Sequence, residues 1–247
     1  MPVTCDRMSP RTWLANRPLQ DHERLYLIIS AASDAEPLKA YYQQPAPAEL
    51  QPIWSGTPFA DWRPVMPYLT ELKPGAPFLQ WIADTDAIDW GWLAISSSTL
   101  DVVHEHLRSL TQVLMPNGTV VFFRFWDGRH IQPVLSGLGD KAGEILPMFD
   151  RYLINGRELQ LKPRAVPPAK PCPWWQVPKA LLDSMAERDP STLINNLMQW
   201  LSEEHPDFYT AYPEGNLRHK VARFVRRPDQ PDTLNEALLN YLILEQG

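Results

Sequence analysis

The segment RFWDGRH, residues 124–130, gathers side chains that could bind an anion or transfer a proton. Arg124 and Arg129 carry guanidinium groups, which bind phosphate and carboxylate groups in a bidentate geometry. Asp127 and His130 are residue types that serve as general acids and bases. The segment therefore allows two functional hypotheses: a phosphoester hydrolase, and a regulatory module that binds a small anion.

The same segment also has a structural interpretation. Because a bidentate arginine–carboxylate pair is geometrically specific, Arg124, Asp127 and Arg129 could act as a clamp on the turn between a strand and a helix. Together with Trp126, they could instead contact a partner protein. Spacing alone favours the clamp over partner contact, and partner contact over catalysis.

Two other clusters resemble metal sites but lack the required spacing. His104 and His106 are two residues apart, which is about 200° round a helix, so they cannot chelate one ion there. The acidic run 84–89 lacks the later glycine and glutamate of an EF-hand calcium loop. The sequence also has no phosphate-binding glycine loop and no GxSxG nucleophile elbow. It therefore predicts no metal and no cofactor, and leaves RFWDGRH as the remaining candidate for chemistry.

Apolar patterns predict the elements that must position RFWDGRH. The predicted strands are residues 25–30, 90–96 and 119–126. The predicted helices are residues 34–44, 76–86, 97–114 and 129–138. This alternation predicts an α/β fold class, with flanking helices and a mixed or mostly parallel sheet. RFWDGRH would then follow the carboxyl end of a strand, where such folds bind ligands.

A proline-rich stretch suggests how the chain is divided. Five prolines fall between residues 163 and 173, and such a composition is typical of a stiff connector. We therefore expect an α/β lobe at 1–161, a linker at 162–175 and an all-helical lobe at 176–247. Trp174 and Trp175 would pack where the linker joins the two lobes.

The densest basic patch of the sequence lies at 217–227 and includes Arg223, Arg226 and Arg227. One interpretation is a solvated helix face. The other is a docking surface for an acidic stretch of a partner protein, because complementary charge speeds encounter and rejects wrong partners. The ten tryptophans of the chain also allow a protein–protein interface, where tryptophan is enriched.

Composition narrows the class of protein further. The chain of 247 residues carries 23 basic and 29 acidic groups, a net charge of −6, which makes a nucleic-acid partner a poor fit. Cys5 and Cys172 form no CxxC motif, which suggests a reducing compartment. No apolar run approaches the ~18–20 residues that cross a bilayer. We expect a cytoplasmic protein with no membrane association.

Several stretches, in order, resemble a bacterial family first catalogued as a domain of unknown function, the type VI secretion adaptor or effector-chaperone proteins (often called Tap or Tec). LYLIIS resembles the opening strand of that family, and GTVVFFRFWDGRHI resembles its FRFYDPR signature. Between them, PIWSGTPFADWRPVMPYLTEL and WGWLAISSSTLDVVHEHLRSLTQV are similar to two further blocks. The similarity covers about residues 25–155. Trp126 stands where the family has tyrosine, and Gly128 where it has proline.

The resemblance implies a function rather than a reaction. Proteins of this family stay in the cytoplasm, bind a toxic effector and help to load it onto the VgrG spike. The expected partners are therefore an effector and VgrG, with no catalytic residue. On this basis Arg124, Trp126, Asp127 and Arg129 are expected to form a clamp or a partner-binding site. Effector contacts are expected at the tryptophan pair 174–175 and at the arginines of 217–227.

Overall fold

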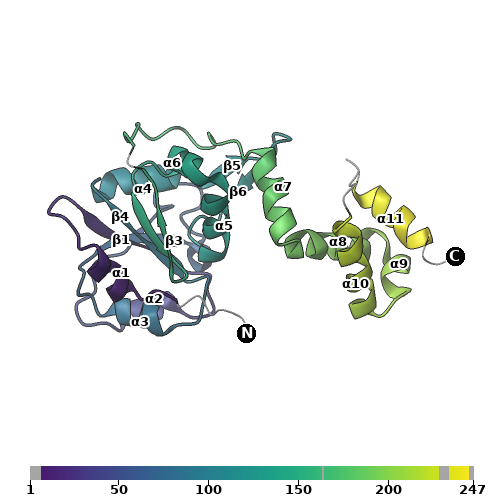
Figure 1. Cartoon of the computed structure of the whole chain (residues 1–247), viewed down its shortest axis with the longest axis horizontal. Coiled ribbons are helices and arrows are strands. Elements are labelled where there is room, and N and C mark those ends of the chain that lie inside the picture. Colours follow the sequence, from purple (N-terminus) through teal and green to yellow (C-terminus); the bar gives the residue numbers. More distant parts are fainter. Residues whose placement is uncertain (1–6, 163, 228–233, 245–247) are drawn as a thin grey trace. The chain divides into compact units, whose positions relative to one another are not determined.

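The computed structural model describes residues 7–162, 164–227 and 234–244; Cys5 lies outside them. The chain divides into two compact units, Met1–Pro178 and Lys179–Gly247 (Figure 1). The first unit contains the RFWDGRH segment and also the proline-rich stretch. Each unit is described by itself below.

The described part of the first unit is built around a six-stranded sheet in the order β2-β3-β1-β4-β7-β8. Its strands are β1 (Arg24–Ser30), β2 (Gln51–Pro52), β3 (Pro67–Leu72), β4 (Gly91–Ser96), β7 (Arg151–Ile154) and β8 (Arg157–Gln160). Every neighbouring pair is antiparallel, from β1 with β3 and β4 outward to both edges.

The prediction of a mixed or mostly parallel sheet is therefore wrong. It rested on the alternation of strands and helices, which is typical of parallel neighbours joined by a crossover helix. Here β3 and β4 are joined through α3 (Phe78–Asp84) and run in the same direction, but β1 lies between them. The parallel strands are thus never hydrogen-bonded to each other, and each pairs with the antiparallel β1 instead.

Helices cover both faces of this sheet, which explains why β1 is a continuous apolar run (Figure 1). Its odd-numbered side chains, such as Leu25 and Leu27, pack in one core with α1 (Pro10–Asn16), α2 (Pro37–Tyr42) and α3. The opposite face carries Tyr26, whose ring meets Phe149 at 6.1 Å. On that side lie α4 (Leu100–Ser109), α5 (Gly128–Leu138) and α6 (Ala142–Ile145).

The expected strand at 119–126 is much shorter than predicted and lies outside the central sheet. It is β6 (Val120–Phe122), which pairs with β5 (Gln112–Leu114) in a separate antiparallel ribbon. Residues 175–177 lie along the other edge of β5, because the N–H of Leu114 donates to Trp175 O and the N–H of Val177 donates to Leu114 O. The chain then turns through residues 123–127 into α5.

The described residues of the second unit form helices and no strand. They are α7 (Lys179–Arg188), α8 (Ser191–Glu204), α9 (Pro206–Thr210), α10 (Glu214–Val225) and α11 (Leu234–Leu244). Apolar faces of α8, α10 and α11 meet in one core, in which Leu201, Val221 and Leu242 are fully buried. The basic residues of α10 are thereby left on its other side.

Candidate functional site

Asp127 is the residue on which the RFWDGRH segment is organised. It is the N-cap of α5, and its Oδ1 accepts a hydrogen bond of 2.9 Å from the N–H of Arg129. An N-cap aspartate satisfies one of the free N–H groups of the first helical turn and places negative charge at the positive end of the helix. The helix therefore begins at this residue for a local reason.

Two arginines donate hydrogen bonds to the Asp127 carboxylate. Arg124 Nη2 donates to Oδ2 at 2.9 Å, while Arg129 donates from Nη2 to Oδ2 at 2.9 Å and from Nε to Oδ1 at 3.2 Å. The Asp127 side chain is 0% exposed, whereas those of Arg124 and Arg129 are 44% and 43% exposed. The carboxylate is thus buried and multiply bonded beneath two guanidinium groups that still reach water.

The network continues from Arg129 to the central sheet. Arg129 Nη2 lies 3.3 Å from Asp89 Oδ2, and Asp89 Oδ1 accepts a hydrogen bond of 2.7 Å from Ser33 Oγ. Ser33 follows β1 and Asp89 precedes β4, so the start of α5 is tied to both strands. The hydrogen bond to Asp127 raises the pKa of Arg129, which keeps its positive charge in this network.

His130 is a minor partner of the carboxylate. Its Nε2 lies 3.7 Å from Asp127 Oδ2, beyond hydrogen-bond distance. Burial lowers the pKa of His130, and the negative charge of Asp127 acts against this shift. His130 therefore contributes less to the network than either arginine.

Gly128 makes close packing possible at the first turn of α5. A Cβ at this position would lie 2.7 Å from Ile88 O and 2.9 Å from Asn155 Oδ1. Asn155 and Gly156 form the tight turn between β7 and β8, with φ values of 52° and 73°. Gly128 thus lets α5 approach the loop before β4 and this turn.

The aromatic residues of the segment point inward and support a second cluster. Trp92, a residue of β4, donates a hydrogen bond from Nε1 to Phe125 O at 2.7 Å, so this strand fixes the backbone of the segment. Trp126 is 3% exposed and meets the edge of Trp54 with ring centroids 5.2 Å apart.

Three aromatic rings pack against Trp54: those of Phe59, Trp62 and Phe122. These three residues are called the aromatic shelf. Phe122 lies 4.9 Å from Phe59 and 5.3 Å from Trp62 between ring centroids. Trp54 contacts all three, at 6.0–6.4 Å. Trp62 is 47% exposed. Sequence reasoning missed this shelf, although the density of aromatic residues in PIWSGTPFADW is a signal that could have indicated it.

The geometry of Asp127 does not suit general base catalysis. A general base must reach the proton that it abstracts, and both Asp127 oxygens already accept hydrogen bonds within the protein. In the part of the chain that the structure describes, no group of three His, Cys, Asp or Glu side chains is placed to hold a metal ion. The segment has the geometry of a tether between backbone segments.

The two histidines of the HEH motif bind separate carbonyl groups. His104 Nε2 lies 3.1 Å from Pro52 O, and His106 Nε2 lies 2.7 Å from Ile145 O. His106 is 3% exposed, and its Nδ1 is buried without a hydrogen-bond partner. Burial lowers the pKa of His106, so the neutral form is favoured.

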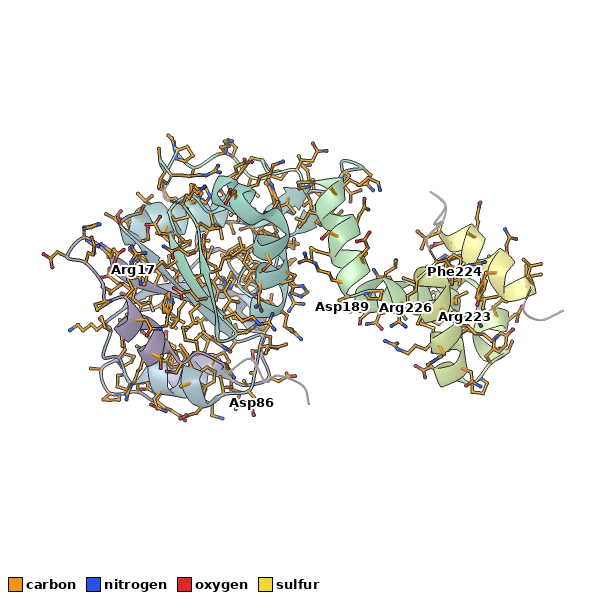
Figure 2. All side chains as sticks on the ribbon, in the orientation of Figure 1. Arg17, Asp86, Asp189, Arg223, Phe224 and Arg226 are labelled. Carbon is orange, nitrogen blue, oxygen red and sulfur yellow. The ribbon has the colours of Figure 1, made fainter. Side chains whose placement is uncertain are left out.

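The other predicted contact residues do not join the hydrogen-bond network of Asp127. Trp174 Nε1 donates to Ser109 Oγ at 3.0 Å, and the Trp175 ring lies 5.4 Å from Phe123, so both pack within the first unit. Arg223 is exposed on α10 and Arg226 is exposed at its C-cap, whereas Phe224 is buried (Figure 2). Arg227 instead lies over the ring of Tyr241, 5.3 Å from its centroid.

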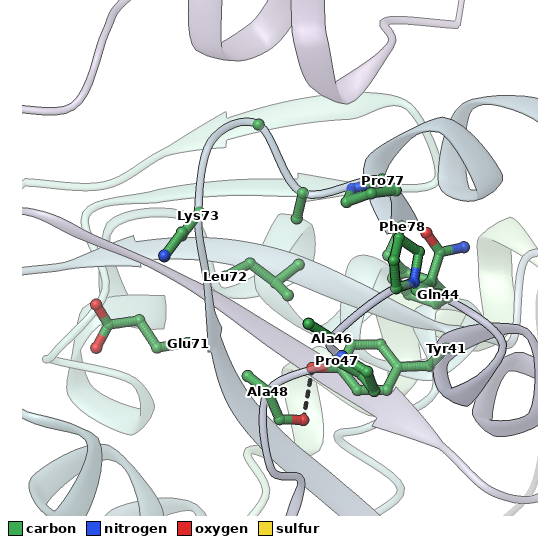
Figure 3. Close-up of a pocket in the computed structure, with 13 residues that line it drawn as sticks. Tyr41, Gln44, Ala46, Pro47, Ala48, Glu71, Leu72, Lys73, Pro77 and Phe78 are labelled. Atoms are coloured by element: carbon green, nitrogen blue, oxygen red, sulfur yellow. Dashed lines mark hydrogen bonds between the residues drawn. The ribbon is translucent and has the colours of Figure 1, made fainter.

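A separate pocket, of about 590 Å³, lies beside α2 and α3 (Figure 3). Its walls are mainly apolar and include Tyr41, Pro47 and Phe78. The Tyr41 hydroxyl donates to Ala48 O at 2.9 Å. Sequence reasoning did not find this pocket, because its lining comes from two separate segments, within residues 41–48 and 71–78, that meet only in the fold.

Comparisons with known proteins agree with the family resemblance. Residues 25–142 match the family described as "Domain of unknown function (DUF4123)". The chain is also 27% identical over 106 residues to "Accessory protein VasW" of Vibrio cholerae serotype O1, a match that covers 43% of this chain and 35% of VasW. The chain thus spans about a third of that relative. No solved structure is significantly similar.

Residues 25–142 therefore match a DUF4123 domain, and the resemblance to the type VI secretion adaptor family is confirmed. The matched range includes Arg124, Trp126, Asp127 and Arg129, together with the aromatic shelf. The second unit, which carries the basic patch, lies outside it. Among the described residues, no helix is long and apolar enough to span a bilayer.

Asp127→Ala should lower the free energy of unfolding of the first unit by about 2–4 kcal/mol, because it removes both the helix cap and the buried partner of two arginines. The half-exposed arginines keep part of their hydration, so the loss should stay below the upper limit for a buried pair. Chemical denaturation would measure the change. Asp140→Ala, at an exposed carboxylate 3.9 Å from Lys162, is the matched control and should change little. Equal stability of Asp127→Ala and the wild type would contradict the tether.

His106 should make the stability of the first unit depend on pH. Its pKa in the folded state is lowered by burial, so below the unfolded pKa of about 6.5 the unfolded state binds more protons and stability falls as the pH drops. Denaturation at pH 7 and pH 5 should show a steeper loss in the wild type than in His106→Gln. His22→Gln, at an exposed position, should keep the wild-type slope. An unchanged slope in His106→Gln would show that the buried imidazole is not responsible.

Proposed function

We propose that this chain is a cytoplasmic adaptor that binds a type VI secretion effector and helps to load it onto the VgrG spike. The observation that carries the proposal is the closed geometry of Asp127, whose two oxygens both accept hydrogen bonds within the protein. The signature segment of the domain thereby holds structure in place. The DUF4123 match and the similarity to an accessory protein support the same conclusion.

In this proposal Arg124, Asp127 and Arg129 form a structural clamp. The clamp fixes Trp126, which packs against Trp54, and Trp54 in turn packs against the aromatic shelf. The alternatives, a phosphoester hydrolase and an anion-binding module, would need Asp127 or the arginines free for a ligand. Asp127 instead accepts hydrogen bonds from Nη2 of Arg124 and from both Nη2 and Nε of Arg129. The adaptor therefore fits the geometry better than either alternative.

We also assign the basic patch, residues 217–227, to partner binding. Arg223, on α10, and Arg226, at its C-cap, are exposed and, among the described residues, their side chains have no ion-pair partner. Arg227 has an internal partner in Tyr241, so Arg223 and Arg226 are the better candidates for contact. Because the second unit lies outside the matched family range, we propose that it selects the particular effector.

The first experiment is affinity purification of the full chain from the organism that produces it. A partner present in stoichiometric amount and identified by mass spectrometry as a secreted toxin would support the adaptor. Hydrolysis of a phosphoester by the pure chain, lost in Asp127→Asn, would instead support the enzyme. Recovery of the chain without any stoichiometric partner would contradict the proposal.

Reversal of charge in the basic patch should weaken binding of that partner. The double variant Arg223→Glu, Arg226→Glu should lose affinity at least tenfold at low salt, and the difference should shrink as salt screens charges beyond about 8–10 Å. Titration calorimetry at two salt concentrations would measure it. Arg11→Glu with Lys141→Glu changes the net charge equally at exposed positions of the first unit and should leave affinity unchanged. Equal effects of both double variants would mean that only net charge matters.

A further inference from the structure

The outer edge of β6 has unpaired backbone groups. Among the described residues β6 pairs only with β5, with Val121 opposite Val113. On the same side, the N–H of Phe123 donates to Thr111 O. Because alternate residues of an antiparallel ladder direct their N–H and C=O groups to opposite sides, those of Val120 and Phe122 point away from β5. They face the position of a further strand.

The other side of this ribbon is already occupied by the chain itself. Residues 175–177 bond to Leu114 through hydrogen bonds of 2.9 and 2.8 Å. Proteins usually protect exposed strand edges with charge, proline or a covering loop. Neither proline nor charge occurs within β6, whose residues are Val120, Val121 and Phe122.

Exposed apolar side chains lie on the same edge. Val120 is 45% exposed, and as alternate residues Val120 and Phe122 project from one face of the ribbon. Phe122 also belongs to the aromatic shelf, in which its ring contacts Phe59 and Trp62. The open backbone edge therefore continues into a surface that can hold the side chains of an added strand.

Hydrogen bonds within the protein hold the loop that carries the shelf. The loop that carries it is closed by hydrogen bonds from Thr57 Oγ1 to Trp54 O at 2.8 Å and from the N–H of Trp62 to Phe59 O at 3.0 Å. Trp54 itself is 1% exposed and rests on Trp126. A preorganised and exposed tryptophan is the kind of residue that dominates binding energy at interfaces.

Positive charge at the Phe122 end of this edge indicates what the added strand would carry. Arg63 follows Trp62, is exposed and has no side-chain partner among the described residues. Arg124 follows β6 at two residues from Phe122; its Nη2 bonds to Asp127, but the side chain is 44% exposed. A partner strand with a carboxylate at this end would complement the two arginines.

We propose that the outer edge of β6, with the aromatic shelf, binds an extended segment of a partner protein by β-strand addition. The segment has apolar residues at alternate positions and an acidic residue at the end that lies beside Phe122. This deepens the proposed function, because the segment would belong to the effector. The test below uses a synthetic peptide, so it can fail or succeed whether or not an effector is recovered.

The probe is a capped heptapeptide that alternates valine and threonine between two terminal glutamates. Added to the isotope-labelled full chain, it should shift the amide resonances of Val120 and Phe122 and the indole resonance of Trp62. A peptide that is N-methylated at the valines cannot donate to the edge and should bind at least tenfold more weakly. The same should hold for a peptide with terminal lysines. Absence of shifts at β6, or equal binding of all three peptides, would overturn the proposal.

Variants of the chain provide a second readout. Val120→Pro removes an N–H that points away from β5, so the ribbon keeps its own hydrogen bonds, and peptide affinity should fall at least tenfold. Val120→Thr keeps the N–H and the branched shape and should bind as the wild type does. Trp62→Ala should weaken binding, whereas Val102→Ala, at a residue 41% exposed on α4, should not. A chain dimer that Val120→Pro abolishes would show that a second copy occupies the edge, against the proposal.

Discussion

The first unit depends on one buried carboxylate. Asp127 caps α5 and accepts hydrogen bonds from two arginines. Through Arg129 and Asp89, this helix start is connected to the ends of β1 and β4. A buried charge is costly unless its oxygens are hydrogen-bonded, so every donor around Asp127 is needed where it lies. That requirement keeps residues 124–129 in one conformation and sets the direction in which Trp126 enters the core.

Contacts between aromatic rings connect Trp126 to the surface of the first unit. Trp126 supports Trp54, and Trp54 supports Phe59, Trp62 and Phe122. Ring pairs at these separations add about 0.5–1.5 kcal/mol each beyond their buried area. The signature segment therefore has a use that does not require it to touch a ligand. It holds a half-exposed tryptophan beside an open strand edge, which is a surface suited to protein contact.

The sequence predicted local features better than long-range ones. Asp127 pairs with Arg124 and Arg129 within a few residues, so spacing was sufficient to propose the clamp. Asp89 and Ser33 join the network through the fold, and nothing near them in the sequence indicated it. The strands at 25–30 and 90–96 were visible as apolar runs, but their antiparallel neighbours depend on β1 lying between β3 and β4. The strand at 119–126 was predicted too long because its later aromatic residues serve the core and the shelf. The Asn155–Gly156 pair is a strong hairpin signal, from which the turn between β7 and β8 could have been predicted.

The central claim is that the Asp127 network positions the aromatic shelf and the edge of β6. Hydrogen–deuterium exchange of the Asp127→Asn variant, compared with the wild type in conditions where both are folded, tests it most directly. The account predicts faster exchange in residues 56–65 and 119–127, with β1 and β4 exchanging as in the wild type. If exchange in residues 56–65 is unchanged while α5 alone becomes less protected, the carboxylate serves only as a helix cap and the account is contradicted.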